Sequence, residues 1–226
     1  MHVPRLMIAL VAIAVAVSGC TNVVAGTPTL ADAGGPDGPI SGNLAATLLS
    51  AEEINSIMGA DDLEVVESSE ELVDHSADIS DPACLGALYN AEEFVYGDSG
   101  WTDLVDEILT QLVDDADFWV EQTAVRFASD EEAAAFYETS KTQWQQCVGR
   151  QVSVYDGNYE FTWEFDGLTV SDTTISQNAL QLDSDGWTCQ HALSAVSDVV
   201  VEASACGMSI SDEAVTMAEA LAKNVG

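Results

Sequence analysis

The segment WTCQHALSAVSDVVVEASAC, residues 187–206, decides the fold. Two runs rich in β-branched and small residues, 187–196 and 199–206, flank the polar dipeptide Ser197-Asp198. Such runs on either side of a short turn predict a β-hairpin. The chain is therefore expected to build an antiparallel sheet around these two strands.

The hairpin fixes a strand register, and the register predicts a disulfide. If the turn is centred between residues 197 and 198, Val196 pairs with Val199. The same register places Cys189 directly opposite Cys206. Their Cα atoms are then expected ~4.5 to 5.5 Å apart, a separation that a disulfide accepts.

Four cysteines follow Cys20 in the sequence, and their even number favours two disulfides over metal thiolates in an exported domain. Once Cys189 and Cys206 are paired, Cys84 and Cys147 pair by exclusion. This second bridge closes the longer loop. Each bridge is expected to contribute on the order of 2–4 kcal/mol to stability.

Capping sequences mark the helix starts. Ser50-Ala51-Glu52-Glu53 is a capping box, and the apolar residues that follow at helical spacing end at Gly59. Ser129-Asp130-Glu131-Glu132 and Ser211-Asp212-Glu213 are two further helix-start sequences, and Pro82 opens a short helical segment. Helices are expected at residues 51–58, at about 83–88, from 129–132 to about 147, and from 211–213 to 222.

Runs rich in β-forming residues lie between the expected helices. Residues 104–113 are ambiguous, because their apolar spacing fits a helix while their place before the next strand suits a hairpin. Strands are expected at 63–67, at 118–127 and, as several antiparallel strands separated by Asp-Gly turns, within 151–182. Segregated helices and strands indicate an α+β fold: a single domain with an antiparallel β-sheet flanked by helices and braced by two disulfides.

The N-terminus has the layout of a secretory signal. Arg5 precedes an apolar run, residues 6–17, that is shorter than the roughly 20 residues of a spanning helix. The following Val17-Ser18-Gly19-Cys20 resembles a bacterial lipobox, in which cleavage precedes a lipid-bearing cysteine. Residues 1–19 are thus predicted to be a lipoprotein signal peptide, 20–42 a flexible Gly/Pro-rich tether, and 43–226 the folded domain on the extracytoplasmic face of the membrane.

The chain is strongly acidic, with 39 Asp and Glu against 5 Lys and Arg and a formal net charge of −34. Such a surface repels nucleic acid and anionic lipid head groups, so neither is expected as a partner. The favoured interpretation is a solvation device for high salt or high solubility. A cation-binding role is the alternative.

Several short motifs resemble a known family. They are Leu48–Asn55 with Met58-Gly59, Asp81–Tyr89, Gly100-Trp101, Glu121-Gln122, the Ala135-Phe136 helix with Gln143–Cys147, Asp185–Gln190, Val200-Val201 and Ala205–Gly207. Together they span nearly all of residues 45–226, and the chain resembles the PknH-like extracellular sensor domain family. The resemblance implies the same two disulfides and a sheet flanked by helices, with a cleft for an unidentified ligand. The sequence shows neither a kinase segment nor a transmembrane helix, which puts direct kinase sensing in doubt.

No catalytic, metal or cofactor constellation is expected. Gly97-Asp98-Ser99-Gly100 is similar to a serine-protease nucleophile loop, but the supporting histidine context is missing, so a turn before a strand is predicted. Asp183-Ser184-Asp185-Gly186 starts like a calcium loop without its distal Glu, and a hairpin turn is predicted there instead. The two histidines of the domain, His75 in a loop and His191 in a strand, are predicted to be structural, with pH sensing as the alternative.

Four residues are candidates for a ligand site: Trp101, Gln122, Arg126 and Trp187. Arg126 is a rare cation on a strand, where it could pair with an anionic ligand or, alternatively, with an internal carboxylate. The leading hypothesis is a non-enzymatic sensing lipoprotein with an unknown envelope ligand or protein partner. A carboxylate-based envelope hydrolase and a structural envelope protein are the alternatives.

Overall fold

An antiparallel sheet organises the folded part of the chain, which a computed structural model describes at residues 43–113, 116–171 and 173–225. Within these residues, nine strands form one sheet in the order β1-β2-β3-β9-β8-β7-β5-β4, with β6 paired to β7. The elements in chain order are η1 (Leu44–Thr47), α1 (Ala51–Met58), β1 (Leu63–Ser69), η2 (Pro82–Ala87), α2 (Glu93–Tyr96), β2 (Trp101–Gln111), β3 (Phe118–Phe127), α3 (Asp130–Cys147), β4 (Gln151–Asp156), β5 (Tyr159–Phe165), β6 (Thr169–Val170), β7 (Thr174–Gln181), β8 (Thr188–Val196), β9 (Val199–Gly207) and α4 (Glu213–Asn224).

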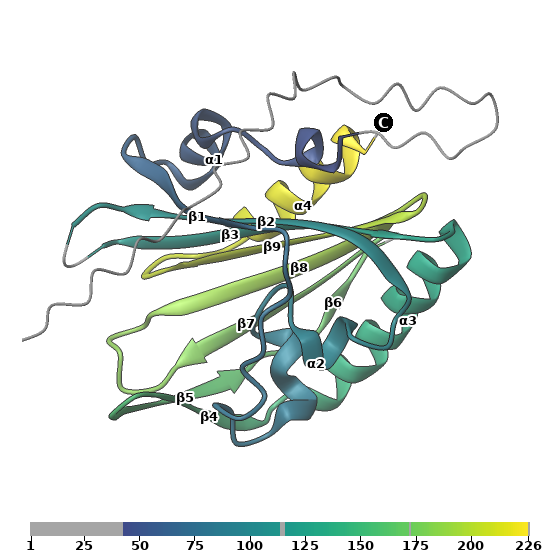
Figure 1. Cartoon of the computed structure of the whole chain (residues 1–226). Coiled ribbons are helices and arrows are strands. Elements are labelled where there is room, and N and C mark those ends of the chain that lie inside the picture. Colours follow the sequence, from purple (N-terminus) through teal and green to yellow (C-terminus); the bar gives the residue numbers. More distant parts are fainter. Residues whose placement is uncertain (1–42, 114–115, 172, 226) are drawn as a thin grey trace, which may run out of the picture. The chain divides into compact units, whose positions relative to one another are not determined.

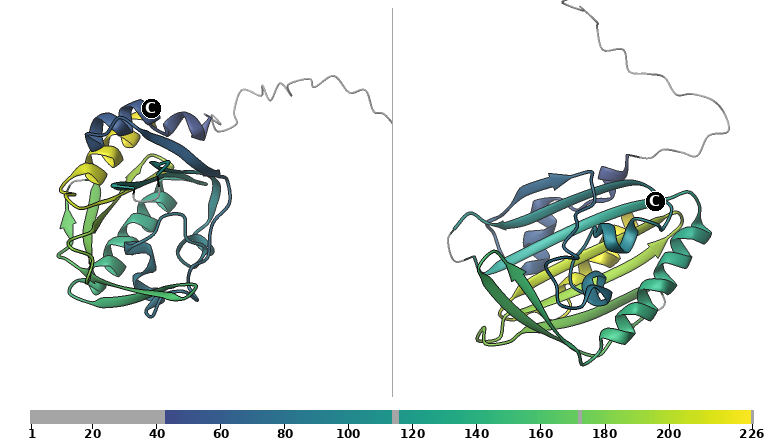
Figure 2. Two further views of the ribbon diagram at one scale, coloured as in Figure 1. Left: turned by 90° about the vertical axis from the view of Figure 1, so that its left-hand side faces the viewer. Right: turned by 60° about the horizontal axis from the view of Figure 1, so that its bottom comes forward.

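Helices cover both faces of the sheet (Figure 1). On the outer face, α1 and α4 pack over a core that includes Ile54, Val201 and Leu221. On the inner face, η2, α2 and α3 pack over a second core that includes Tyr96, Trp144 and Val200. Figure 2 shows the sheet curving around these inner elements. Strand β9 lies between β3 and β8 and is buried along its whole length, as expected for a strand covered on both faces.

The hairpin and both disulfides are confirmed. Val196 pairs with Val199 and Cys189 with Cys206, so the register is the one read from the sequence. The Cys189–Cys206 Cα separation is 4.0 Å, shorter than the predicted range. Cys84 and Cys147 form the second bridge, with Cα atoms 5.7 Å apart.

The capping sequences mark the starts of α1, α3 and α4, although the N-cap residue of α4, Asp212, makes no side-chain capping hydrogen bond. The Ser50 hydroxyl accepts a hydrogen bond from the Glu53 amide, and Glu53 accepts one from the Ser50 amide, which is a complete capping box. Gly59 ends this helix with φ at 68°, a left-handed conformation that glycine adopts at little cost. The segment after Pro82 is a 3₁₀-helix, Pro82–Ala87, in place of an α-helix.

The ambiguous segment around residues 104–113 is a strand, β2. It pairs with β1 on one side and β3 on the other, so sheet pairing outweighs its helical apolar spacing. The short helix α2 has no counterpart among the predicted elements. The predicted signal peptide and tether, with Cys20, lie outside the described residues.

Candidate ligand-binding cleft

A cleft of about 450 Å³ opens between the inner face of the sheet and the loop that follows β1. Two of its lining residues, His75 and Asp78, come from that loop, and Tyr89 comes from the segment after η2. The others come from the β4–β5 hairpin and the end of β7: Val154, Tyr155, Asp156, Phe161, Trp163 and Gln181. Its volume is in the range of small-molecule sites.

The sheet wall of the cleft follows from strand alternation. Val154 lies opposite Phe161, and Trp163 lies opposite Gln181 on the neighbouring strand. Because alternate residues of a strand share a face, Asp156 projects on the same side as Val154. Val154 and Trp163 are buried and form the floor, while Asp156 is exposed at the mouth.

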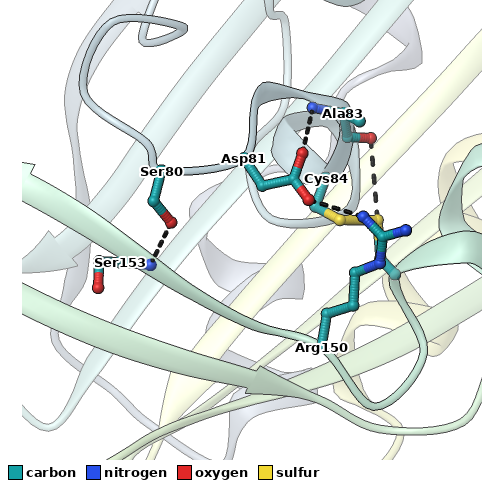
Figure 3. A network of polar contacts seen from close by, with 7 residues as sticks. Ser80, Asp81, Ala83, Cys84, Arg150 and Ser153 are labelled. Carbon is teal, nitrogen blue, oxygen red and sulfur yellow. Dashed lines mark hydrogen bonds and ion pairs between the residues drawn. A yellow bond between two sulfur atoms is a disulfide. The ribbon is translucent and has the colours of Figure 1, made fainter.

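The opposite wall is a loop fastened to β4 by main-chain hydrogen bonds. The Tyr155 amide donates to the Asp78 carbonyl at 2.7 Å, and the Ser80 amide donates to the Ser153 carbonyl at 2.8 Å. The amide of Ser153 in turn donates to the Ser80 hydroxyl at 2.9 Å (Figure 3). The loop is thereby held along the edge strand of the sheet.

A second set of contacts holds the same loop beside the first disulfide (Figure 3). Asp81 accepts a hydrogen bond from the Ala83 amide at 3.3 Å, which starts η2, and pairs with Arg150 at 2.7 Å. Cys84 lies on η2 and bridges to Cys147 at the end of α3. The wall of the cleft is therefore tied to both the sheet and the longest helix.

Glu92 holds the part of the loop that contains His75. Its carboxylate accepts from the His75 amide at 3.0 Å and lies 2.6 Å from His75 Nδ1. The Glu92 side chain is fully buried, whereas that of His75 is 47% exposed. Burial raises the pKa of Glu92, and the hydrogen bonds from His75 act in the opposite direction.

On the neighbouring strands β2, β3 and β9, away from the strands that line the cleft, three buried carboxylates form what we call the buried acid cluster: Asp106, Glu121 and Glu202. In the sheet, Thr123 lies between Asp106 on β2 and Glu202 on β9. Its hydroxyl donates to Asp106 at 2.5 Å, and the Tyr96 hydroxyl donates to Glu202 at 2.5 Å. The cluster thus lies within the inner core, under the α2 segment.

Burial alters the protonation of this cluster. It raises the pKa of Asp106 to about 7, and the nearby charge of Glu202 adds to the rise against the opposing hydrogen bond from Thr123. Burial also raises the pKa of Glu121 well above its usual range, and the nearby charge of Asp106 raises it further. Two of the three carboxyls therefore tend to retain a proton under mildly acidic conditions.

Tyr89 lines the cleft, and the charges of nearby carboxylates act on its phenol. Burial raises the pKa of its phenol to about 12, and the charges of four acids contribute in the order Glu92, Glu121, Asp156 and Asp78. Two of these acids are buried and two line the mouth of the cleft. The ring of His75 packs against Tyr89 with centroids 5.4 Å apart.

The second histidine, His191, is buried in β8. Its ring lies 4.6 Å from the Trp144 ring, and Nε2 lies 3.0 Å from a carboxylate oxygen of Glu202. The angles at this contact are poor, so neither ring nitrogen has a well-formed hydrogen bond within the described part of the chain. The position fits the structural role predicted for this residue.

None of the four candidate ligand residues lines this cleft. Gln122 is buried under the outer helices, where its amide group donates to and accepts from the backbone of Leu49. Arg126 Nη1 pairs with Asp198 at 3.3 Å, the internal ion pair that the sequence offered as the alternative. Trp101 and Trp187 pack at the margin of the inner core.

Sequence reasoning missed the cleft residues because their functional signal is weak. Tyr89 ends one of the motifs that carry the family resemblance, and Val154, Phe161 and Trp163 belong to runs interpreted simply as strands. Alternation could have placed these three on one face. Nothing local indicated that a loop more than sixty residues earlier, around His75 and Tyr89, would face them.

The motif weighed for catalysis and the motif weighed for calcium binding are both turns. Residues 97–100 form a turn before β2, and residues 183–186 form the turn between β7 and β8, with Asp183 and Asp185 at positive φ. Across the described residues, no three His, Cys, Asp or Glu side chains are arranged to hold a metal ion. No helix in that part of the chain combines the length and apolar character needed to cross a membrane.

These features define a disulfide-braced α+β domain with a cleft of small-molecule size. Residues 40–224 match the family model of the PknH-like extracellular domain, and the chain belongs to this family. Its sequence is 33% identical over 171 residues to the serine/threonine-protein kinases PknH of Mycobacterium bovis and Mycobacterium tuberculosis. The match covers 76% of this chain and 27–29% of the kinases, so the chain corresponds to under a third of their length.

The fold agrees with this membership. The crystal structure of the extracellular domain of PknH from Mycobacterium tuberculosis superposes with a TM-score of 0.78 at 32% sequence identity. The superposition covers 80% of this chain and 94% of that domain. The similarity is therefore to the extracellular part of these kinases.

Proposed function

We propose that this chain is an exported lipoprotein whose folded domain senses a ligand on the outer face of a membrane without chemical turnover. Residues 1–19 act as the signal peptide, Cys20 carries the lipid, residues 20–42 form the tether, and the sensor domain follows at 43–226. The partners are the membrane, through the anchor, and an unidentified envelope ligand or protein. The acidic surface disfavours nucleic acid.

The cleft carries the ligand-binding part of this proposal. It has a ligand-sized volume, a buried aromatic floor and a few polar groups at its mouth, which is the usual composition of a small-molecule site. Its loop wall is fixed to the sheet before any ligand arrives, which lowers the entropic cost of binding. The family relationship to an extracellular domain supports an extracytoplasmic site of action.

A panel of cell-envelope fragments and lipids tests ligand binding. The purified chain is incubated with each compound, and its melting temperature and native mass spectrum are recorded. We expect at least one compound to raise the melting temperature and to bind without being altered, and Phe161→Ala to weaken that binding. Release of a product would support the hydrolase alternative. If no compound of the panel binds, a structural role is supported.

Lipid anchoring is tested separately in cells of the source organism fed labelled palmitate. The wild-type chain should carry the label, appear in the membrane fraction and be digested by protease added to intact cells. Cys20→Ser should abolish the label and release the protein from membranes. A labelled Cys20→Ser variant, or wild-type protein recovered unprocessed from the cytosol, contradicts the anchoring model.

A further inference from the structure

The cleft combines aromatic rings with carboxylates. Tyr89, Phe161 and Trp163 supply aromatic rings, and the exposed residues Asp78 and Asp156 supply carboxylates. Among the described residues that line it, none is lysine or arginine. Asp78 lies on the loop, where its carbonyl accepts from the Tyr155 amide, and Asp156 lies at the end of β4, so both carboxylates belong to the same end of the cleft lining.

His75 is paired with a carboxylate of the protein. Its Nδ1 lies 2.6 Å from Glu92, whose carboxylate is fully buried. The Glu92 carboxylate also accepts from the His75 amide, so this side of the ring is held within the protein and is not offered to a ligand. The charge available to a ligand at the mouth therefore comes from Asp78 and Asp156.

The potential within the cleft is negative on physical grounds. Burial raises the pKa of the Tyr89 phenol most, and the charges of Glu92, Glu121, Asp156 and Asp78 raise it further; the last two of these acids line the cleft. The floor of the cleft is formed by the buried side chains of Val154 and Trp163. Apolar walls of this kind have a low dielectric constant and strengthen the electric field of nearby carboxylates. An anionic group entering the cleft would be repelled by this arrangement.

We infer that the cleft binds an organic cation, in which a primary or quaternary ammonium group is carried by a small apolar body. The inference rests on the proposed function and names the chemical class of its ligand. Ring faces attract ammonium groups through their quadrupoles, and the carboxylates at the mouth balance the charge. A neutral sugar could stack on the same rings, but it would not balance the negative charge of the carboxylates.

Choline and 3,3-dimethylbutan-1-ol test this inference directly, because they share a shape and differ by an ammonium nitrogen in place of carbon. The full-length chain in mild detergent is titrated with each compound by calorimetry at low ionic strength. Phenyltrimethylammonium and spermidine extend the cationic set, and glucose and inorganic phosphate serve as the neutral and anionic probes. We expect a cation to bind at least about tenfold more tightly than the neutral alcohol, and added salt to weaken it.

Matched variants locate the binding. Asp78→Asn and Asp156→Asn should each weaken cation binding by roughly threefold, since each removes one exposed carboxylate at the mouth. Glu160→Gln is the control, because Glu160 is an exposed acid on the same hairpin that does not line the cleft. Phe161→Leu keeps an apolar side chain but removes a ring, so it should weaken choline while leaving the far-ultraviolet circular dichroism unchanged.

Equal binding of choline and the alcohol would overturn the inference, as would failure of all three cations. If glucose or phosphate binds instead, and Phe161→Leu weakens it, the cleft is a ligand site of another class and the proposed function stands. If the envelope panel and all these probes fail alike, the proposed function fails with the inference. The two ideas are therefore separated by which probes bind.

Discussion

Asp106 makes the stability of this protein depend on pH in an unusual direction. Burial raises its pKa to about 7 in the fold, well above the usual value of an aspartate, so the folded state holds a proton that the unfolded chain releases. Stability from such a group is fully present below the unfolded pKa and is lost as pH rises through the folded one. We expect the free energy of unfolding to fall by on the order of a few kcal/mol between about pH 5 and pH 8.

Asp106→Asn is the matching variant, because an amide resembles the protonated acid and does not titrate. Urea denaturation across the same pH range should show a flatter profile for this variant than for the wild type. Asp103→Asn, an exposed acid on the same strand, is the control and should keep the wild-type profile. A wild-type protein that becomes more stable with rising pH would refute the assignment.

Gln122 is a structural residue, and its loss should be costly. Its side chain is completely buried and satisfies both the amide and the carbonyl of Leu49 at 2.8 and 2.9 Å. Gln122→Met would leave both backbone groups without partners under the outer helices, at a cost of on the order of 2–4 kcal/mol. Equilibrium denaturation measures this, with the exposed Gln146→Met as control, and similar midpoints for the two variants would argue against the role.

At the scale of elements, the two disulfides should differ in their contribution. Cys84–Cys147 closes a separation of 63 residues and ties η2 to α3, whereas Cys189–Cys206 spans 17 residues within one hairpin. Restricting the longer loop removes more entropy from the unfolded chain, by roughly 1 kcal/mol. We expect the Cys84→Ala/Cys147→Ala pair to lose more stability in urea than Cys189→Ala/Cys206→Ala, and the reverse order would contradict this entropic account.

Local signals predicted several elements well. The capping box at Ser50 and the glycine at position 59 fix both ends of α1, because both interactions are made within one or two helical turns. The hairpin register was readable for a similar reason, since two strands joined by a tight turn have little freedom to slip. By contrast, β2 was ambiguous because its neighbours, β1 and β3, supply the pairing that makes it a strand.

For the whole molecule, the excess of acids sets the response to salt. The net charge is −34, so the acidic side chains repel one another in the compact state, and added ions screen that repulsion. We expect the melting temperature to rise as sodium chloride is added, and potassium chloride to act equally at the same ionic strength. A fall in melting temperature would contradict the screening account, and a marked difference between the two salts would instead favour specific cation binding.

The sequence by itself determined the class of fold, both ends of α1 and the central hairpin with its disulfide, because caps, turns and strand alternation act over a few residues. The Cys84–Cys147 pairing then followed by exclusion. The tertiary structure alone decided where the cleft lies. The cleft forms because the loop that carries His75 and Asp78 is hydrogen-bonded to Ser153 and Tyr155 of β4, residues distant in the chain. It also assigned Gln122 and Arg126 to internal contacts, since burial and partners depend on the packing of the whole sheet and not on neighbouring residues.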